Sequence, residues 1–325
     1  RAQWLDRLGH LGEALADVAG DADPVARVED AARRASGADA VAVVTEISHG
    51  RGEVLVKFAG QADWQRPQPL LALYPGDQVK SGGDARAVVV FTGGGGTRTV
   101  TAAGGPLTIA APAAATGGDR GRALVGSVAS FLLGRRPDTT YRSLSVRSVQ
   151  VPPVILAPRS TRLMPGPLTF EWGGPAQARY TVRLVSPSGV QWEVGDVPRA
   201  PLAYPASAPA LTPGVRYTWE LATPGREPQR AEFEVLTAAD AARVGDAVTQ
   251  LGPSSGHPPN TLALLRAGLL FSEGLHGDAR RELLAAIARD GREPALHVLL
   301  AQVYAAMGLA ELAAEAHERA TALTR

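Results

Sequence analysis

The C-terminal part of the chain repeats itself with a period of 34 residues. Six small or apolar positions of the first copy recur at that offset in the second. They are Ala267, Leu270, Gly274, Leu275, Ala279 and Ala286, which reappear as Ala301, Tyr304, Gly308, Leu309, Ala313 and Ala320. Apolar residues after residue 237 follow a helical spacing. A 34-residue helical period with one glycine in each copy predicts two stacked helical hairpins.

These matches resemble the tetratricopeptide repeat. The resemblance implies small residues where the two helices of a hairpin approach closely, and a glycine between the helices. Arg266 departs from the pattern because the repeat usually has leucine there, whereas Leu300 fits in the second copy. Two copies are fewer than the roughly three that make an array stable, so another surface must cover the apolar ends.

The open end of this short array is the candidate interface. We expect a helix over residues 238–251 to cap one end and a helix over residues 310–323 to form the other. That second end can meet the preceding β-sandwich, another copy of the chain or a partner protein. We therefore predict a protein interface at Tyr304, Leu309, Leu312, His317 and Leu323.

Residues 40–112 have the pattern of a small all-β domain, with short apolar runs between turns such as the run from Gly93 to Gly96. The ordered segments resemble the FecR-type domain. They are Gly52 to Val56, Trp64, Leu73 to Val79, Ser81 to Ala85 and Ala87 to Phe91. The glycine run departs from the family, which usually has an acidic or polar residue before glycine. The resemblance implies a periplasmic location and signal transfer by protein contact.

Residues 150–236 are predicted to form a β-sandwich. The segment Leu211-Thr-Pro-Gly-Val-Arg-Tyr217-Thr-Trp219 resembles the strand E to F corner of fibronectin type III and related sandwiches. That resemblance implies that the Tyr217 hydroxyl bonds to nearby backbone. Trp172 is the expected core indole of the facing sheet.

The fold class is therefore multidomain β plus α: a small all-β FecR-like domain, a β-sandwich and C-terminal α-helical hairpins. The predicted order is an N-terminal helical segment (1–39), the FecR-like domain (40–112), an Ala/Gly-rich linker with a short helix (113–149), the fibronectin/Ig-like sandwich (150–236) and the repeats (237–325). In the first segment Trp4, Leu8, Leu11, Leu15 and Val18 share one helical stripe. We expect the linker helix to dock on its neighbour rather than on a membrane.

Patterns that suggest catalysis or metal binding occur in the wrong context. Gly252-Pro-Ser254-Ser-Gly256 matches the G-x-S-x-G nucleophile pattern and His257 follows it, but a helix precedes it where that motif needs a strand. The histidines lack the spacing of a metal site. Asp77 and Asp84 fall at turns, where Asp accepts from backbone amides. We predict no catalytic, cofactor-binding or metal-binding residue.

Charge and composition limit the classes of partner that the chain is expected to bind. The 325 residues include 33 basic and 32 acidic side chains without a block of one sign, so a nucleic-acid partner is not expected. The absence of cysteine excludes disulfides and thiolate metal sites. No apolar run reaches the roughly 18 residues of a membrane span. Because the chain begins at Arg1, we expect a processed or truncated form, with membrane contact only through an anchor preceding that residue.

Together these observations predict a non-catalytic bacterial envelope scaffold or sensor, without a cofactor, that binds partner proteins. A homo-oligomer is a further arrangement that the sequence leaves open. No segment that would bind a sigma factor is recognisable, so we expect a general role in protein assembly rather than in sigma-factor regulation. The alternative is a cell-wall or polysaccharide-binding protein that uses Trp64, Trp172, Trp192 or Trp219, although alternation along strands makes core positions the default.

Overall fold

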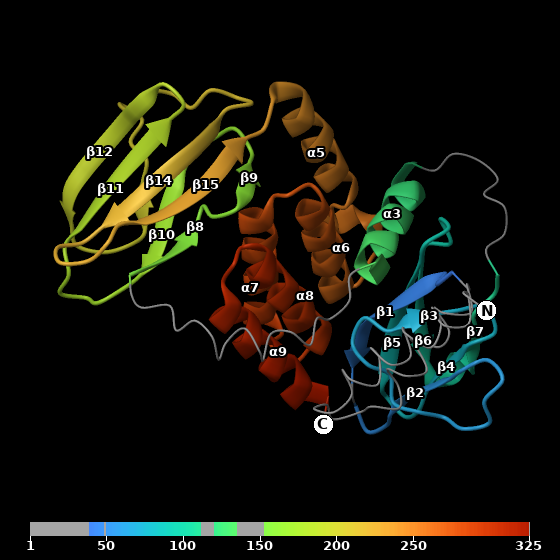
Figure 1. Ribbon diagram of the computed structural model, residues 1–325. Coiled ribbons are helices and arrows are strands. Elements are labelled where there is room, and N and C mark those ends of the chain that lie inside the picture. The colour runs from blue at the N-terminus through green and yellow to red at the C-terminus, as the bar shows by residue number, and fades with distance from the viewer. Residues whose placement is uncertain (1–38, 49, 112–119, 135–152, 325) are drawn as a thin grey trace, which may run out of the picture. The chain divides into compact units, whose positions relative to one another are not determined.

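The computed structural model describes residues 39–48, 50–111, 120–134 and 153–324 (Figure 1). The predicted helical stripe before residue 39 and most of the predicted linker lie outside the described residues. The fold mixes β-sheets with helices, as the sequence predicts, and divides into two compact units, residues 1–139 and 140–325. Each unit is described by itself.

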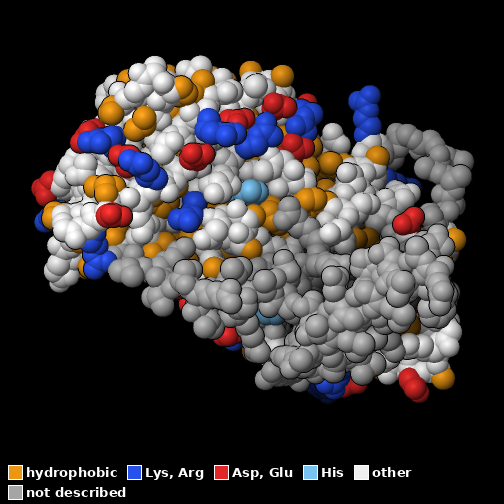
Figure 2. Space-filling view, viewed as in Figure 1, with side chains coloured by type: hydrophobic (Ala, Val, Ile, Leu, Met, Phe, Trp, Pro, Cys, Tyr) orange, Lys and Arg blue, Asp and Glu red, His pale blue; other side chains and the backbone are white. Residues whose placement is uncertain are grey.

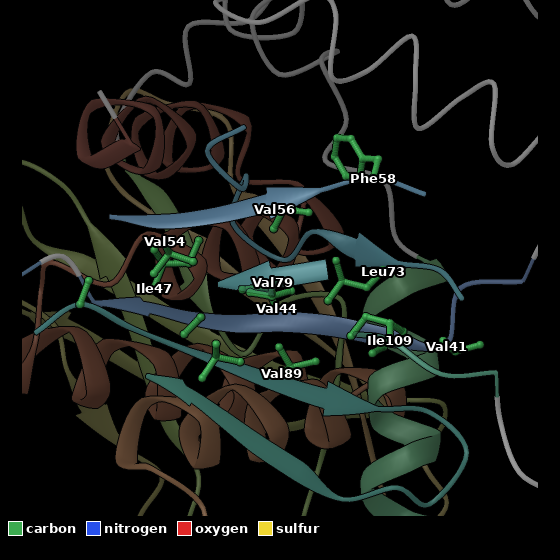
Figure 3. Close-up of a cluster of buried hydrophobic side chains, with 14 residues drawn as sticks. Val41, Val44, Ile47, Val54, Val56, Phe58, Leu73, Val79, Val89 and Ile109 are labelled. Atoms are coloured by element: carbon green, nitrogen blue, oxygen red, sulfur yellow. The ribbon is translucent and has the colours of Figure 1, made fainter. Parts of the chain in front are cut away.

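The described residues of the first unit form two antiparallel sheets. One has the order β3-β1-β5-β6 and is formed by Ala72–Leu73, Ala42–Ser48, Arg86–Phe91 and Thr97–Thr101. The other has the order β2-β4-β7 and is formed by Val54–Lys57, Gln78–Ser81 and Leu107–Thr108. Alternate side chains of β2 are buried, because successive residues of a strand point to opposite faces. Figure 3 shows the resulting core, in which Val44 and Val89 of one sheet and Val54, Val56 and Val79 of the other lie together.

Polar turn residues hold this unit together. Both carboxylate oxygens of the buried Asp77 accept backbone N–H groups, from Ala59 and Tyr74, at 2.9 Å each. Asp84 accepts the backbone N–H of Arg51. Both aspartates therefore have the turn role that the sequence predicts. The glycine run forms the hairpin corner between β5 and β6, closed by the bond from Phe91 N to Gly96 O at 3.0 Å.

The helix α3, Arg120–Gly134, packs against β1 and β5. Its buried face comprises Val125, Gly126, Val128, Ala129 and Leu132. A Cβ atom at Gly126 would lie only 2.1 Å from the carbonyl oxygen of Thr92, so glycine is required for this close approach. The short helix of the linker is therefore docked on its neighbouring β domain.

The second unit begins with a β-sandwich-like region. One sheet has the order β12-β11-β14-β15-β9 and is formed by Gly189–Val197, Tyr180–Ser186, Arg216–Ala222, Gln229–Val235 and Thr161–Leu163. The other has the order β13-β10-β8 and is formed by Leu202–Ala203, Thr169–Gly173 and Val154–Ala157. All pairs are antiparallel except β9 with β15, which is parallel.

Aromatic side chains fill the space between these two sheets. Trp219 is fully buried, and its ring centroid lies 4.8 Å from that of Phe170. Trp172 is also in the core, as predicted, and packs edge-on against Tyr180. The hydroxyl of Tyr217 accepts the backbone N–H of Thr212 at 2.8 Å, the bond that the sequence resemblance implies.

Five α-helices follow the sandwich in the described residues. They are α5 (Ala238–Gln250), α6 (Pro259–Ser272), α7 (His276–Arg289), α8 (Pro294–Ala306) and α9 (Ala310–Thr324). The pairs α6/α7 and α8/α9 form hairpins whose turns match at the 34-residue offset. Gly274 and Gly308 have φ values of 76° and 70°, and the amides of Leu275 and Leu309 bond to Leu270 O and Tyr304 O at 2.9 Å. Glycine suits this left-handed turn, so the sequence repeat is also a structural repeat.

Among the described helices, none combines the length and hydrophobicity that a bilayer-spanning helix needs.

Candidate protein interface

The five predicted interface residues occupy different depths in the second hairpin. Tyr304 and Leu309 are buried, whereas Leu312, His317 and Leu323 on α9 are half-buried. The structure therefore divides the predicted set. Tyr304 and Leu309 serve packing within the described unit, and the three α9 residues retain partly exposed side chains.

Tyr304 contacts the neighbouring hairpin through Arg280. The Arg280 guanidinium hydrogen bonds the Tyr304 hydroxyl and donates to Glu171 of β10 at 2.8 Å. Burial acts to lower the pKa of Arg280, but these hydrogen bonds outweigh it and the pKa lies above its ordinary value. One cation therefore links the sandwich, α7 and α8.

Two arginines from one sandwich segment cap equivalent turns of the two hairpins. We call residues 159–162 the clasp. Arg159 Nε donates to Met307 O at 2.7 Å, and Arg162 Nη1 donates to Glu273 O at 3.2 Å. Met307 and Glu273 are 34 residues apart and each ends the first helix of its hairpin. Carbonyls at a helix C-terminus lack partners within the helix and carry partial negative charge, so each arginine supplies a donor and an opposite charge.

Backbone and small polar groups complete the clasp at the first hairpin. Arg162 N donates to Gly274 O at 2.8 Å, and Thr161 Oγ1 accepts Gly277 N at 3.2 Å. Nδ1 of His276 lies 2.5 Å from Ser160 O. Thr161 thus satisfies a free amide in the first turn of α7, the role that an N-cap side chain usually performs. Ser160 has a φ of 46°, a costly conformation that these bonds on both sides maintain.

The clasp is also bonded to the sandwich. The buried indole N–H of Trp219 donates to Pro158 O at 2.7 Å, just before the clasp begins. Thr161 then pairs with Phe233 as β9 joins β15. The clasp therefore connects the sandwich core directly to both hairpin turns.

An ion-pair network surrounds this junction. Arg243 of α5 donates to both Glu273 carboxylate oxygens, at 2.6 and 2.8 Å, and Arg162 lies 3.5 Å from Asp240. The hydrogen bond from Arg243 lowers the pKa of Glu273, and the one from Thr237 lowers the pKa of Asp240. Figure 2 shows basic and acidic side chains interspersed over the described part of the face that it draws.

A groove lies beside α5. Its volume is about 370 Å³, and its lining comes from α5, α6, α7 and Met164: Met164, Val244, Gly245, Val248, Arg266, Leu270, Asp278, Arg281, Glu282 and Ala285. Arg266 Nη2 lies 3.5 Å from Glu282 Oε2, while its buried Nε has no hydrogen-bond partner among the described residues. Sequence reasoning did not predict this groove. The sequence feature that could have indicated the groove is Arg266, the residue that departs from the repeat pattern.

The G-x-S-x-G segment lies between helices. Residues 253–255 form a short 3-10 helix after α5, and α6 begins at Pro259. This position lacks the strand that a nucleophile elbow requires. Burial lowers the pKa of His257. Within the described ranges, no group of three or more His, Asp or Glu side chains is placed to hold a metal ion.

Among the tryptophans that the structure describes, the two half-buried ones have different surroundings. Trp192 stacks on Phe170, with ring centroids 5.9 Å apart, and so extends the sandwich core. Trp64 lies under the ammonium groups of Lys80 and Lys57, which are 3.9 and 5.4 Å from the ring centroid. These are cation–π contacts, so Trp64 has a positively charged setting outside the core.

No known protein family matches the chain, and no curated protein sequence matches it.

Proposed function

We propose that the protein is a non-catalytic scaffold or sensor of the bacterial envelope that acts by binding other proteins. The observation that carries this proposal is the clasp. It fixes both helical hairpins to the sandwich through Arg159 and Arg162, so their surfaces are held in one arrangement before a partner arrives. A preorganised surface pays less conformational entropy on binding.

The finer assignments rest on the motif resemblances and on supporting geometry. The two-sheet unit with its buried Asp77 turn supports a FecR-like domain, from which the periplasmic or envelope location is inferred. The Tyr217 bond supports a fibronectin-like sandwich. The matching turns at Gly274 and Gly308 support tetratricopeptide-like hairpins, a module that binds proteins.

The test is affinity capture with the full chain. Purified protein is coupled to beads, incubated with bacterial envelope fractions and chemically crosslinked. We expect at least one protein to be retained specifically and to crosslink to residues 237–325. The double variant Arg159→Ala/Arg162→Ala should retain less of it, because the hairpins lose their fixed arrangement. Failure of the wild-type chain to retain any specific protein would contradict the proposal.

Trp64 supports a second candidate, a cell-wall or polysaccharide-binding protein. A half-buried indole beside Lys57 and Lys80 combines an apolar face with two cations, a setting suited to sugars that carry carboxylates. Co-sedimentation with purified cell wall tests it. This candidate predicts binding that Trp64→Ala abolishes and that Trp192→Phe, a change in the sandwich, preserves. Absence of sedimentation with the wild-type chain would exclude it.

A further inference from the structure

Both lysines of the chain lie at one tryptophan. Of the 33 lysine and arginine side chains, two are lysines, Lys57 and Lys80. Their ammonium groups lie 5.4 and 3.9 Å from the ring centroid of Trp64. The lysines come from the adjacent strands β2 and β4, and Trp64 comes from the segment after β2. A chain that otherwise uses arginine therefore places both of its lysines at the same site.

The two lysines lie on the outer face of the sheet β2-β4-β7. Val56 and Val79 point into the core on the inner face (Figure 3), and the residues that follow them point the opposite way because side chains alternate along a strand. Lys57 pairs across the strands with Gln78, so Lys80 is its diagonal neighbour. Diagonal neighbours on one face of a sheet are about 7–8 Å apart. The outer face thus carries two partly exposed cations at this separation.

Backbone hydrogen bonds hold Trp64 beside Lys57. Val56 and Gln65 exchange two N–H···O bonds of 2.8 Å each and form an antiparallel bridge. In this register Trp64 lies opposite Lys57 and on the same face. The indole is therefore placed where both ammonium groups contact it.

The two ammonium groups have no anionic partner among the described residues. Within the described ranges, each contacts Trp64 and forms neither an ion pair nor a hydrogen bond. The nearby acids do not neutralise them, because Glu53 pairs with Arg66, and the exposed Asp63 forms no ion pair in the described part of the chain. Like charges this close repel each other, and an anion bound between them removes that repulsion.

The geometry of the site describes the ligand. Lys80 occupies one face of the Trp64 ring, so the ammonium groups, rather than that ring face, are available to a ligand. In an extended peptide, residues i and i+2 point the same way and lie about 7 Å apart. This distance is close to the separation of the two lysines. Two carboxylates at alternate positions of an extended segment can therefore pair with both lysines at once.

We propose that this surface, the lysine platform of Lys57, Lys80 and Trp64, binds an extended acidic segment of a partner protein. Carboxylates at positions i and i+2 of that segment accept hydrogen bonds from the two ammonium groups. Trp64 is a positioning residue that holds both ammonium groups by cation–π contact. The inference rests on the proposed protein-binding function and names one surface and the chemistry of the partner segment.

Isotope-labelled dimethylation of the lysines in the full chain tests the inference by NMR, because the chain has only two lysines and methylation retains their charge. The Trp64 ring current should displace both methyl signals, and Trp64→Leu should remove the displacement. The probes are two threonine heptapeptides with two glutamates each, at i and i+2 in one and at i and i+1 in the other. We expect the first peptide to shift both lysine signals and to bind about threefold more tightly, because only its glutamates share one face.

Charge-matched variants separate this site from general electrostatic attraction, with binding followed through the indole N–H signal of Trp64. Lys57→Gln/Lys80→Gln should weaken the first peptide about tenfold, the loss of two surface ion pairs, and Lys80→Gln alone about threefold. Arg98→Gln removes one exposed charge of β6 in the same unit and should leave the affinity unchanged. Lys57→Arg/Lys80→Arg keeps both charges and should retain binding within about threefold.

Several outcomes would overturn the inference. One is that neither peptide shifts the lysine signals, and another is that both bind equally well. Weakening by Arg98→Gln as large as that by Lys80→Gln would show only general attraction. A uronic acid oligosaccharide that shifts the signals when the peptides do not would assign the platform to the second candidate function. The proposed function fails separately, when envelope capture retains no protein; a protein that Lys57→Gln/Lys80→Gln retains as well as the wild type does refutes only the platform.

Discussion

The two helical hairpins have the same turns but different neighbours. Gly274 and Gly308 close their turns with equivalent hydrogen bonds, and one clasp arginine caps each turn. However, the buried apolar position of Leu300 is occupied by Arg266 in the first hairpin, and the half-buried position of Ala314 is occupied by Arg280. The conformation of each turn is determined by the residues of the turn itself, whereas the side chains on the helix faces differ because each hairpin packs against different neighbours. The following predictions test this difference.

The largest effect is expected at Arg280, which bonds Glu171 and Tyr304 and has only 12 % of its side chain exposed. Arg280→Ala leaves a carboxylate and a hydroxyl without their partner. We expect it to lower the free energy of unfolding by about 3 kcal/mol. Urea denaturation measures the loss. The control is Ala314→Ser, at the position of α9 that corresponds to Arg280 in the second hairpin. Because Ala314 is half-buried, this substitution should change the free energy of unfolding by less than about 1 kcal/mol.

Alanine at the two turn glycines should have unequal effects. Both positions have positive φ, which costs a non-glycine residue about 1–2 kcal/mol. A Cβ at Gly274 would in addition lie 3.1 Å from Arg162 Cδ, whereas the nearest atom at Gly308 is Arg159 Nη2 at 3.4 Å. We therefore expect Gly274→Ala to destabilise more than Gly308→Ala. Equal midpoints in urea for the two variants would show that the clasp does not constrain the first turn more tightly.

Gly245→Ala should raise the free energy of unfolding. The residue lies inside α5, where glycine costs about 0.5–1 kcal/mol relative to alanine, and the new methyl group points into open space. Thermal unfolding should show a higher midpoint. A lower midpoint would mean that the groove is narrower than described.

The smallest effect concerns pH. The pKa of Glu273 is lowered in the folded protein, first through its hydrogen bond from Arg243. Its contribution to stability is therefore complete above the unfolded pKa of about 4.3 and is lost as pH falls through the lower folded value. Glu273→Gln should flatten the decline of stability below about pH 5. If the urea midpoint of Glu273→Gln fell between pH 6 and pH 3 as steeply as that of the wild type, this role of Glu273 would be contradicted.

Local features of the fold could be predicted from the sequence, and distant contacts could not. The Tyr217 bond and the Asp77 turn involve residues close in the chain whose spacing defines them. The clasp joins Arg159 to Met307 across 148 positions, and its segment has the composition of an ordinary proline-containing loop. No local pattern indicates which helix end such an arginine will reach.

The same limit applies to the candidate interface. Helical spacing predicts that Tyr304 belongs to an apolar surface that needs a cover, and the structure buries this residue within the described unit. It could not predict that Arg280 and the sandwich lie next to that surface, because this depends on how the two domains pack. Arg266 was recognisable as an exception to the repeat, but the groove around it exists only once α5 is placed.

The central claim, that the clasp joins the sandwich and both hairpins into one cooperative body, is tested most directly by native-state hydrogen exchange of residues 153–324. In the wild type, we expect the slowest amides of Tyr217 to Trp219 and of α8 to exchange with the same free energy of opening. In Arg159→Ala/Arg162→Ala, α8 should exchange through a lower-energy opening while the sandwich retains its protection. Equal protection of both regions in the double variant would contradict the claim.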